Sequence, residues 1–218
     1  MDTALFRSNA EHINLNKHCL HVYSGNIEDY INEVENYFFL LDDEEKKRAL
    51  LYKFEKDKIL FVVSHGVLRN ILSAYTGISA GAILFSKNKF GKPFVQNHTI
   101  EFNLSHSGKY FAIAVSCINS VGIDVEEINT QFDFSEIVKQ HFSINEKAQI
   151  ESSGNSQQTF FMLWTQKEAY LKMKGVGLNE KEDLNERQKT VQIQTKVFKR
   201  IALSVCSHPD NTVDFFKI

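Results

Sequence analysis

Apolar residues recur three and four positions apart in the first part of the chain, a spacing that predicts amphipathic helices. One such run covers residues 27–41 and follows a strand predicted at 18–23. A second run, over 61–75, predicts a longer helix that ends at Gly77, because glycine readily takes the left-handed conformation that closes a helix. The first third of the chain is therefore predicted to be mainly helical.

Two capping boxes mark the starts of further helices. Asp42 has Glu45 three residues after it. Ser143 has Glu146 at the same distance, and in such a pair each side chain satisfies a free backbone amide at the helix start. A last helix is predicted over 160–174, where a glycine follows.

Alternation with a period of two, and short apolar runs between turn residues, predict strands in the middle and at the end of the chain. Gly91-Lys92-Pro93 and the Asn-Ser pair at 119–120 are predicted to be turns. Helices and strands are thus interleaved in two similar blocks, which is an α+β pattern, although no residue-level repeat is visible. The predicted strands cover residues 82–85, 100–104, 110–116, 121–126, 191–197 and 201–205.

The composition predicts well-packed domains without a flexible linker. Of the 218 residues, 43% are hydrophobic and 18 are Phe, which is enough for a sizeable core. Pro93 and Pro209 are the only prolines, so a domain boundary has to be a short turn. We expect an N-terminal subdomain over 1–118 and a C-terminal subdomain over 119–218.

Charge and cysteine usage argue against several classes of protein. The net charge of −2 and the pI near 6.4 provide no positive field for nucleic acid. Cys19, Cys117 and Cys206 are odd in number and far apart, which fits a reducing compartment better than a disulfide framework or a zinc site. No secretion signal and no apolar run of about 18 residues is apparent, so we expect a cytoplasmic protein without a membrane segment.

Asp124 and Glu126 are the first candidates for chemistry. In the predicted 121–126 strand both point to one face beside Gly122, with their α-carbons roughly 6.5–7 Å apart. Two carboxylates at this distance repel one another unless a cation or a donor lies between them. The pair therefore indicates either a bound Mg²⁺ or a strand whose outer face is exposed to water.

The predicted 160–174 helix carries a second group of charges. Trp164, Glu168 and Lys172 follow one another at steps of four along one side. Lys167 lies about 100° around the helix from Glu168, so one acid is flanked by two bases. The arrangement fits a functional site, and it also fits an exposed face on which Glu168 and Lys172 form a pair worth about 0.2–0.5 kcal/mol.

The segment FNLSHSG, residues 102–108, ends a strand in a glycine turn. It would present His106 and backbone amides at a sheet edge, where oxyanions are commonly bound. Nucleophilic Ser–His catalysis is not indicated, because the adjacent Ser105 and His106 diverge in a strand and the Gly-x-Ser-x-Gly elbow is absent.

Taken together, four motifs closely resemble, in order and spacing, the signature of the 4′-phosphopantetheinyl transferase superfamily. The resemblance covers about residues 40–180 and is closest to the surfactin-synthetase-activating type. It implies an α+β fold in which two similar α/β subdomains pack as a pseudo-dimer within one chain, and a monomeric protein. The motifs are GKP at 91–93, FNLSHSG at 102–108, GIDVE at 122–126 and WxxKEAYxKxxG at 164–175.

The family resemblance implies a metal site and a reaction. The acids of the GIDVE and WxxKE motifs bind Mg²⁺ in this family, which here selects Asp124, Glu126 and Glu168, with Mn²⁺ as an alternative ion. The implied reaction moves 4′-phosphopantetheine from coenzyme A to a serine of an apo carrier protein and releases 3′,5′-adenosine bisphosphate. Glu168 would also accept the serine proton, and Lys172 would neutralise or protonate the leaving phosphate.

The resemblance also implies contacts with coenzyme A. Ser105, His106, Lys167 and Lys172 would contact its phosphates. Lys92 would line the adenine or phosphate pocket, although a solvated lysine on a hairpin is an equal interpretation of the GKP turn.

One position departs from the family pattern. The family often has an arginine for the 3′-phosphate where this chain has Leu60, and Arg48 is the candidate to supply that charge unless it lies on a solvated helix face. The departure leaves a non-catalytic coenzyme A or carrier-protein binding module as the alternative function. Phe132, Phe134 and Phe142 are candidates for a carrier-docking patch or, equally, for the core, and the sequence does not select one class of carrier.

Overall fold

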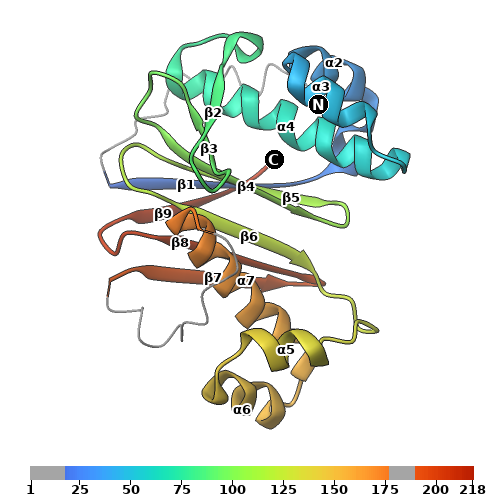
Figure 1. The fold of residues 1–218 in the computed structure, drawn as a ribbon, viewed down its shortest axis with the longest axis vertical. Coiled ribbons are helices and arrows are strands. Elements are labelled where there is room, and N and C mark those ends of the chain that lie inside the picture. The colour runs from blue at the N-terminus through green and yellow to red at the C-terminus, as the bar shows by residue number, and fades with distance from the viewer. Residues whose placement is uncertain (1–17, 177–189) are drawn as a thin grey trace.

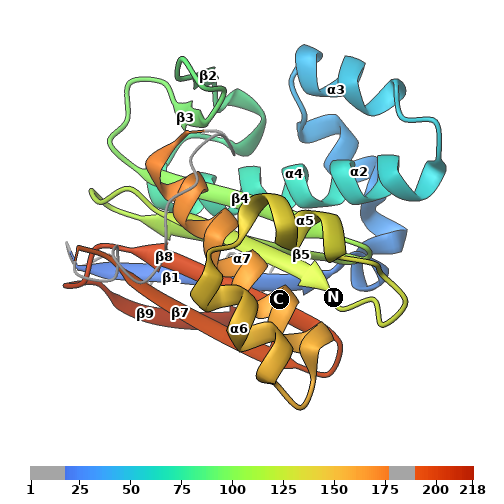
Figure 2. The same cartoon turned by 60° about the horizontal axis from the view of Figure 1, so that its bottom comes forward.

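The computed structural model describes residues 18–176 and 190–218, and its two main sheets lie face to face between two long helices (Figures 1 and 2). The N-terminal sheet has the strand order β4-β5-β1-β9, and the C-terminal sheet has the order β6-β8-β7. These strands are β1 (Cys19–Asn26), β4 (Glu101–Ser107), β5 (Tyr110–Ser116), β6 (Gly122–Glu127), β7 (Gln192–Phe198), β8 (Ile201–Ser207) and β9 (Thr212–Lys217).

The apolar run of β5 is explained by burial on both of its faces. Phe111, Ile113 and Val115 pack in the core under the long helix α4 (Glu55–Thr76). Ala112 and Ala114 point the other way, into the core between the two sheets, where they meet β6 and β8. A strand covered on both faces needs apolar residues at every position, which is why β5 lacks a period of two.

Most of the predicted helices are present. The 27–41 run begins as a 3₁₀-helix, η1 (Ile27–Glu33), and continues as α2 (Val34–Leu40). Asp42 caps α3 (Asp43–Leu50) with the predicted capping box. The helix predicted at 61–75 starts earlier, as α4, and ends at Gly77, whose φ is 70°.

Helix α4 is long and apolar enough to cross a membrane by length and composition alone, the only such helix in the part of the chain that the structure describes. About 61% of its apolar window is buried, and it packs on β4 and β5. Burial against a sheet is the position of a core helix, so its composition follows from packing.

The second half adds three helices, α5 (Ser135–His141), α6 (Ile144–Ser152) and α7 (Ser156–Lys174). The second predicted capping box is confirmed at the start of α6, and α7 ends at Gly175 in the left-handed conformation, as predicted. Short helix α5 was not predicted. Phe134 and Phe142 belong to the core around α7, and Phe132, which is 40% exposed, packs against the same aromatic cluster.

The strand predicted at 82–85 is wrong. Residues Ala80–Ala82 form a 3₁₀ turn, η2, and the strand starts later, as β2 (Phe85–Lys87), which pairs with β3 (Pro93–Val95) in a hairpin. The guanidinium of Arg69 donates hydrogen bonds to the carbonyls of Ala80 and Ile83, each at 3.0 Å. This contact holds the segment in a turn that its apolar sequence does not predict.

The α+β class is confirmed, and in each half one long helix covers one sheet. The 118/119 boundary that we expect falls in the connection between β5 and β6. Strand β9, however, lies in the N-terminal sheet, parallel to β1, so the last strand of the chain crosses back to the first half. This pairing was not predicted.

Candidate functional site

Strand β6 is held at its free edge by side chains of β4. Every second backbone N–H of β6 points away from β8 and donates a hydrogen bond to a side-chain oxygen of β4. These oxygens stand at every second position of β4, so the two strands share a polar ladder without forming a sheet. The pairs are Ile123 N with Asn103 Oδ1 (2.8 Å), Val125 N with Ser105 Oγ (3.4 Å) and Glu127 N with Ser107 Oγ (3.3 Å).

The same serines orient the acids of β6. Ser105 donates its hydroxyl to Asp124 Oδ1 at 2.8 Å, and Ser107 donates to Glu126 Oε2 at 2.5 Å. Asn103 and Ser107 were missing from the candidates named from the sequence. Their signal was the Asn-x-Ser-x-Ser spacing, which places all three polar side chains on one face of a strand.

Gly122 lets α7 lie directly on β6. A Cβ atom there would lie 1.9 Å from the carbonyl oxygen of Ala169 and 2.3 Å from the amide of Met173. The close contact brings the predicted face of α7 to the acids, and Lys172 Nζ lies 2.5 Å from Asp124 Oδ1 and 3.0 Å from Ser105 Oγ.

We expect the substitution Gly122→Ala to lower the free energy of unfolding by about 1–3 kcal/mol, because backbone atoms of α7 must move to admit the methyl group. Urea denaturation measures the change. Gly154→Ala is the control, since nothing lies within 4 Å of the added Cβ, and it should change stability by less than about 0.5 kcal/mol. Equal effects of the two variants would mean that α7 does not depend on this contact.

Burial raises the pKa values of all three acids, and like charges add to the shift for Glu126 and Glu168. Burial raises the pKa of Asp124, which is 3% exposed, while Lys172 and Ser105 oppose the shift. Burial also raises the pKa of Glu126 to about 7, Ser107 opposes this, and both Asp124 and Glu168 add to it. The pKa of Glu168 is raised by burial and then by Asp124. The helix acid and the strand pair therefore act on one another as one electrostatic cluster.

The cluster fits a hard divalent cation. Asp124 Oδ2 is buried and has no hydrogen-bond partner among the described residues, which costs free energy unless a cation binds it. The donors are carboxylate oxygens, as Mg²⁺ prefers, and a bound cation would lower the raised pKa values by stabilising the charged forms.

The raised pKa of Glu126 predicts how stability depends on pH without metal. The pKa of Glu126 is near 7 in the folded protein and 4.5 without the fold, so the folded protein binds this proton more tightly. The proton therefore stabilises the folded state fully below about pH 4.5, and this contribution to the free energy of unfolding is lost as the pH rises through 7. Its upper limit is about 3 kcal/mol. Urea denaturation in the presence of a chelator tests this. Between pH 5 and 8 the free energy of unfolding of Glu126→Gln should fall less than that of the parent protein. Parallel pH curves would contradict the raised pKa.

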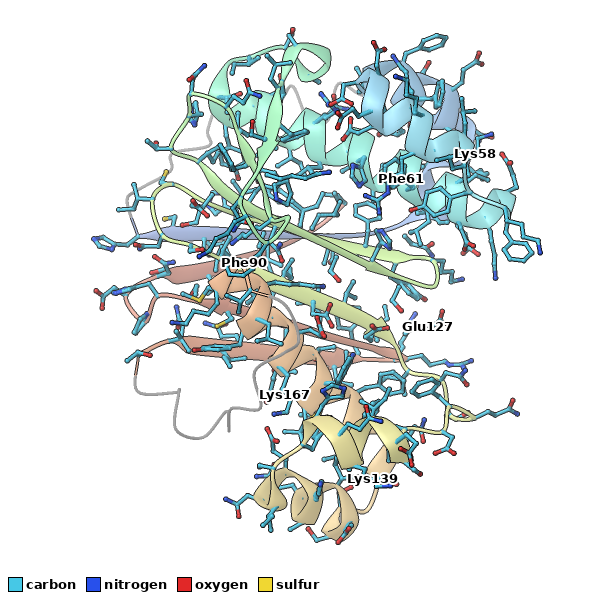
Figure 3. All side chains as sticks on the ribbon, viewed as in Figure 1. Lys58, Phe61, Phe90, Glu127, Lys139 and Lys167 are labelled. Atoms are coloured by element: carbon cyan, nitrogen blue, oxygen red, sulfur yellow. The ribbon has the colours of Figure 1, made fainter. Side chains whose placement is uncertain are left out.

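Basic side chains from three elements, α4, α7 and α3, lie near His106 on β4. Burial lowers the pKa of His106 to about 4 although part of its surface is exposed, and His65, Lys172 and Arg48 lower it further. His65 and Arg48 both lie on the ring of Phe61, at 4.0 and 5.0 Å (Figure 3). A neutral imidazole close to Lys172 and Arg48 is a suitable donor for an anionic ligand, whose charge would favour protonation of the ring.

The predicted coenzyme A contacts divide into two groups. Ser105 and Lys172 contact Asp124 directly, whereas Arg48 is linked to this site through His106, whose pKa both Lys172 and Arg48 lower. Lys167 does not, because its Nζ lies 2.9 Å from a buried oxygen of Glu146 on α6 and over the ring of Phe142 (Figure 3). The structure therefore gives Lys167 a partner in the core, and a contact with coenzyme A stays a prediction without support from its position.

Lys92 also has protein partners. Its Nζ donates to the carbonyl of Val121 at 2.9 Å and to Ser120 Oγ at 3.1 Å, and burial lowers its pKa. The side chain thus ties the β2–β3 hairpin to the start of β6, and a role in an adenine or phosphate pocket stays a prediction. Leu60 is 7% exposed in the N-terminal core, so a charge at this position would be buried.

Comparison with known proteins gives two family matches and several relatives. Residues 120–215 match the 4′-phosphopantetheinyl transferase superfamily, and residues 30–118 match the N-terminal region of 4′-phosphopantetheinyl transferases. The chain is similar to 4′-phosphopantetheinyl transferase HetI of Nostoc sp., with 30% identity over 171 residues, which is 76% of this chain and 72% of the relative.

Two further relatives have the same description. The chain is 36% identical over 154 residues to 4′-phosphopantetheinyl transferase gsp of Aneurinibacillus migulanus, covering 67% of this chain and 63% of the relative. It is 27% identical over 150 residues to 4′-phosphopantetheinyl transferase Sfp of Bacillus subtilis, covering 67% of this chain and 66% of the relative. The matched part thus spans slightly less than two thirds of these two relatives.

Proposed function

Because the chain belongs to the 4′-phosphopantetheinyl transferase superfamily, we propose that it transfers the 4′-phosphopantetheine group of coenzyme A to a serine of an apo carrier protein and releases 3′,5′-adenosine bisphosphate. The observation that carries the proposal is the cluster of Asp124, Glu126 and Glu168 beside Lys172, with one buried oxygen of Asp124 left without a partner. This combination provides oxygen ligands for a cation and a positive side chain for a phosphate.

Asp124, Glu126 and Glu168 would hold Mg²⁺, or Mn²⁺ in its place. The ion, when bound, supplies positive charge for the diphosphate oxygens of coenzyme A. Ser105 and Ser107 keep two of the carboxylates oriented through the hydrogen bonds described above. Orientation of the acids before binding reduces the reorganisation that the reaction requires.

Lys172 and Glu168 would move the protons. The serine oxygen of the carrier attacks the β-phosphorus, a new P–O bond forms, and the bond from this phosphorus to the bridging oxygen breaks. Glu168 lies in the acidic cluster, and its carboxylate would accept the serine proton. Lys172 is 29% exposed and would donate to the leaving phosphate oxygen.

The other phosphates of coenzyme A would meet the cationic groups of the N-terminal half. These groups are His106 of β4, His65 of α4 and Arg48 of α3. His65 and Arg48 both lie close enough to His106 to lower its pKa. Arg48 can therefore supply charge that Leu60 does not. We expect coenzyme A to bind with its diphosphate at the acids and its remaining phosphate toward these groups.

The proposal is tested by mixing the protein with coenzyme A, Mg²⁺ and a panel of apo carriers from peptide, polyketide and fatty-acid synthases. We expect at least one carrier to gain the mass of the phosphopantetheinyl group and an equal amount of 3′,5′-adenosine bisphosphate to appear. Binding of coenzyme A by calorimetry without either product across the panel would instead favour a non-catalytic binding module.

We also propose a cytoplasmic, monomeric protein that binds neither nucleic acid nor membrane. The proposal rests on the near-neutral net charge and on the pseudo-dimer, in which one chain supplies both sheets and both sets of charged groups. Light scattering with purified protein measures the mass, and a dimer would contradict this assignment.

A further inference from the structure

Three side chains of types that can bind a metal lie together on β1 and β9, at the side of the N-terminal sheet away from β4. Cys19 and His21 point to the same face of β1, and the parallel register of β9 places Asp214 beside His21. One ligand atom from each of the three residues lies within 4.8 Å of the others. The spacing of cysteines in the sequence argued against a zinc site, and the β1–β9 pairing, which was not predicted, is what brings this group together.

The imidazole of His21 is oriented for a ligand. Its Nδ1 lies 2.6 Å from the hydroxyl of Tyr75 on α4, and its Nε2 faces the carboxylate of Asp214 at 3.9 Å. Histidines that bind metals usually have one nitrogen fixed in this way by a second partner.

A second thiol lies across the strand pair. In the β1–β5 register Leu20 is opposite Ser116, and continuing it by one residue places Cys117 opposite Cys19. The register places the side chain of Cys117 on the same face of the sheet as Cys19 and His21. Neither cysteine is in a disulfide.

We propose that Cys19, His21, Asp214 and Cys117 bind a zinc ion that is independent of the catalytic cation. Two sulfurs, one nitrogen and one oxygen form the soft and borderline donor set that selects Zn²⁺ over Mg²⁺. On binding, two S–H bonds are replaced by two Zn–S bonds and two protons leave to solvent. The side chain of Asp214 is 53% exposed, so it can turn toward the ion and leaves a path from solvent.

The location implies a structural role. The four ligands come from β1, β9 and the end of β5, so the ion would fasten the last strand of the chain to the first. The strand register gives its distance from the acidic cluster. His106, next to Ser105 on β4, is opposite Phe111 of β5, and Phe111 is opposite Gly25 of β1. Cys19 lies six residues before Gly25 on the same strand. Six residues of strand correspond to about 20 Å, so the zinc site is remote from the acidic cluster.

The test uses the full chain, reduced, freed of metal by a chelator and then kept in excess Mg²⁺ to occupy the acidic cluster. We expect one equivalent of Zn²⁺ to bind and to raise the melting temperature. Co²⁺ used as the probe should give the charge-transfer absorption of a cobalt–thiolate bond, which reports sulfur ligands directly. Absence of this absorption, or no binding of Zn²⁺ by equilibrium dialysis, would overturn the proposal.

Variants identify the ligands. Cys19→Ser, Cys117→Ser and Asp214→Asn should each weaken Zn²⁺ binding by at least about 10-fold and reduce the gain in melting temperature. His208→Gln is the matched control, because His208 and Asp210 form an exposed pair at 3.5 Å without a thiol, and it should bind Zn²⁺ normally. Circular dichroism verifies folding. Unchanged affinity in Cys19→Ser would overturn the site, and unchanged affinity in Cys117→Ser would remove that residue from it.

Discussion

Replacement of Glu168 by glutamine is expected to lower kcat/KM for carrier modification by about 10³-fold or more. The substitution removes a side chain proposed both to bind the cation and to accept the serine proton, and either loss alone would cost at least about 10²-fold. The rate of mass gain on the carrier measures the effect. The control is Glu127→Gln (Glu127 is labelled in Figure 3), because this acid follows Glu126 on β6 and no described residue of the cluster bonds to its carboxylate.

The same Glu168→Gln variant should be as stable as the parent or more stable without metal. The pKa of Glu168 is raised by burial and by Asp124, so its charged form is disfavoured in the folded protein at neutral pH. Glutamine keeps the shape and removes the charge. A marked loss of stability in chelator, with transfer retained, would show that Glu168 has a structural role.

The acids of the site could be predicted from short-range spacing. Asp124 and Glu126 share a face because a strand repeats every two residues, and Glu168 and Lys172 share a side because a helix nearly repeats every four. Gly122 could be predicted as a close approach only in part, because its partner, the backbone at Ala169, lies 47 residues away in the sequence. Periodicity predicts the direction of a side chain, whereas tertiary packing determines its partner.

Lys167 and Lys92 show where this reasoning fails. Lys167 shares a motif with Glu168 and Lys172, which reach the acidic cluster, and Lys92 lies in the GKP turn. The ammonium group of each nevertheless contacts a protein group from another element. For Lys167 that group is Glu146, which the sequence identified only as part of a capping box, where it also accepts from Ser143. Lys167 lies about 100° around the helix axis from Glu168, so it points in another direction. Only the packing of α6 against α7 determines which group Lys167 contacts.

The missed elements have physical reasons of their own. Helix α5 has seven residues, too few to show a clear helical period. Strand β9 has only six residues, TVDFFK, and its two adjacent phenylalanines interrupt the period of two that would mark a strand. Its place beside β1 depends on a pairing between the two ends of the chain, which local pattern cannot predict.

Replacement of Arg69 by leucine is expected to lower the free energy of unfolding by about 3–5 kcal/mol. The guanidinium is fully buried and donates to Asp42 at 2.8 Å, to Glu45 at 2.7 Å and to two carbonyls of the segment around Ala80. Leucine removes the donor of the two carbonyls and the positive charge that pairs with the two carboxylates, and a buried charge without its partner is costly. Urea denaturation at neutral pH measures the loss.

The Arg69 network also holds the groups proposed to bind coenzyme A. Glu45 joins Arg69 to His65, and α3, which begins at this network, carries Arg48. Arg69→Leu should therefore weaken coenzyme A binding by calorimetry at temperatures where it is folded. The control is Lys58→Met, which breaks an exposed pair with Glu55 at 3.2 Å on α4 (Figure 3) and should cost less than about 1 kcal/mol. Equal stability losses in the two variants would mean that the buried network contributes no net stability. The free energy of desolvating its charges would then equal the free energy gained from its hydrogen bonds.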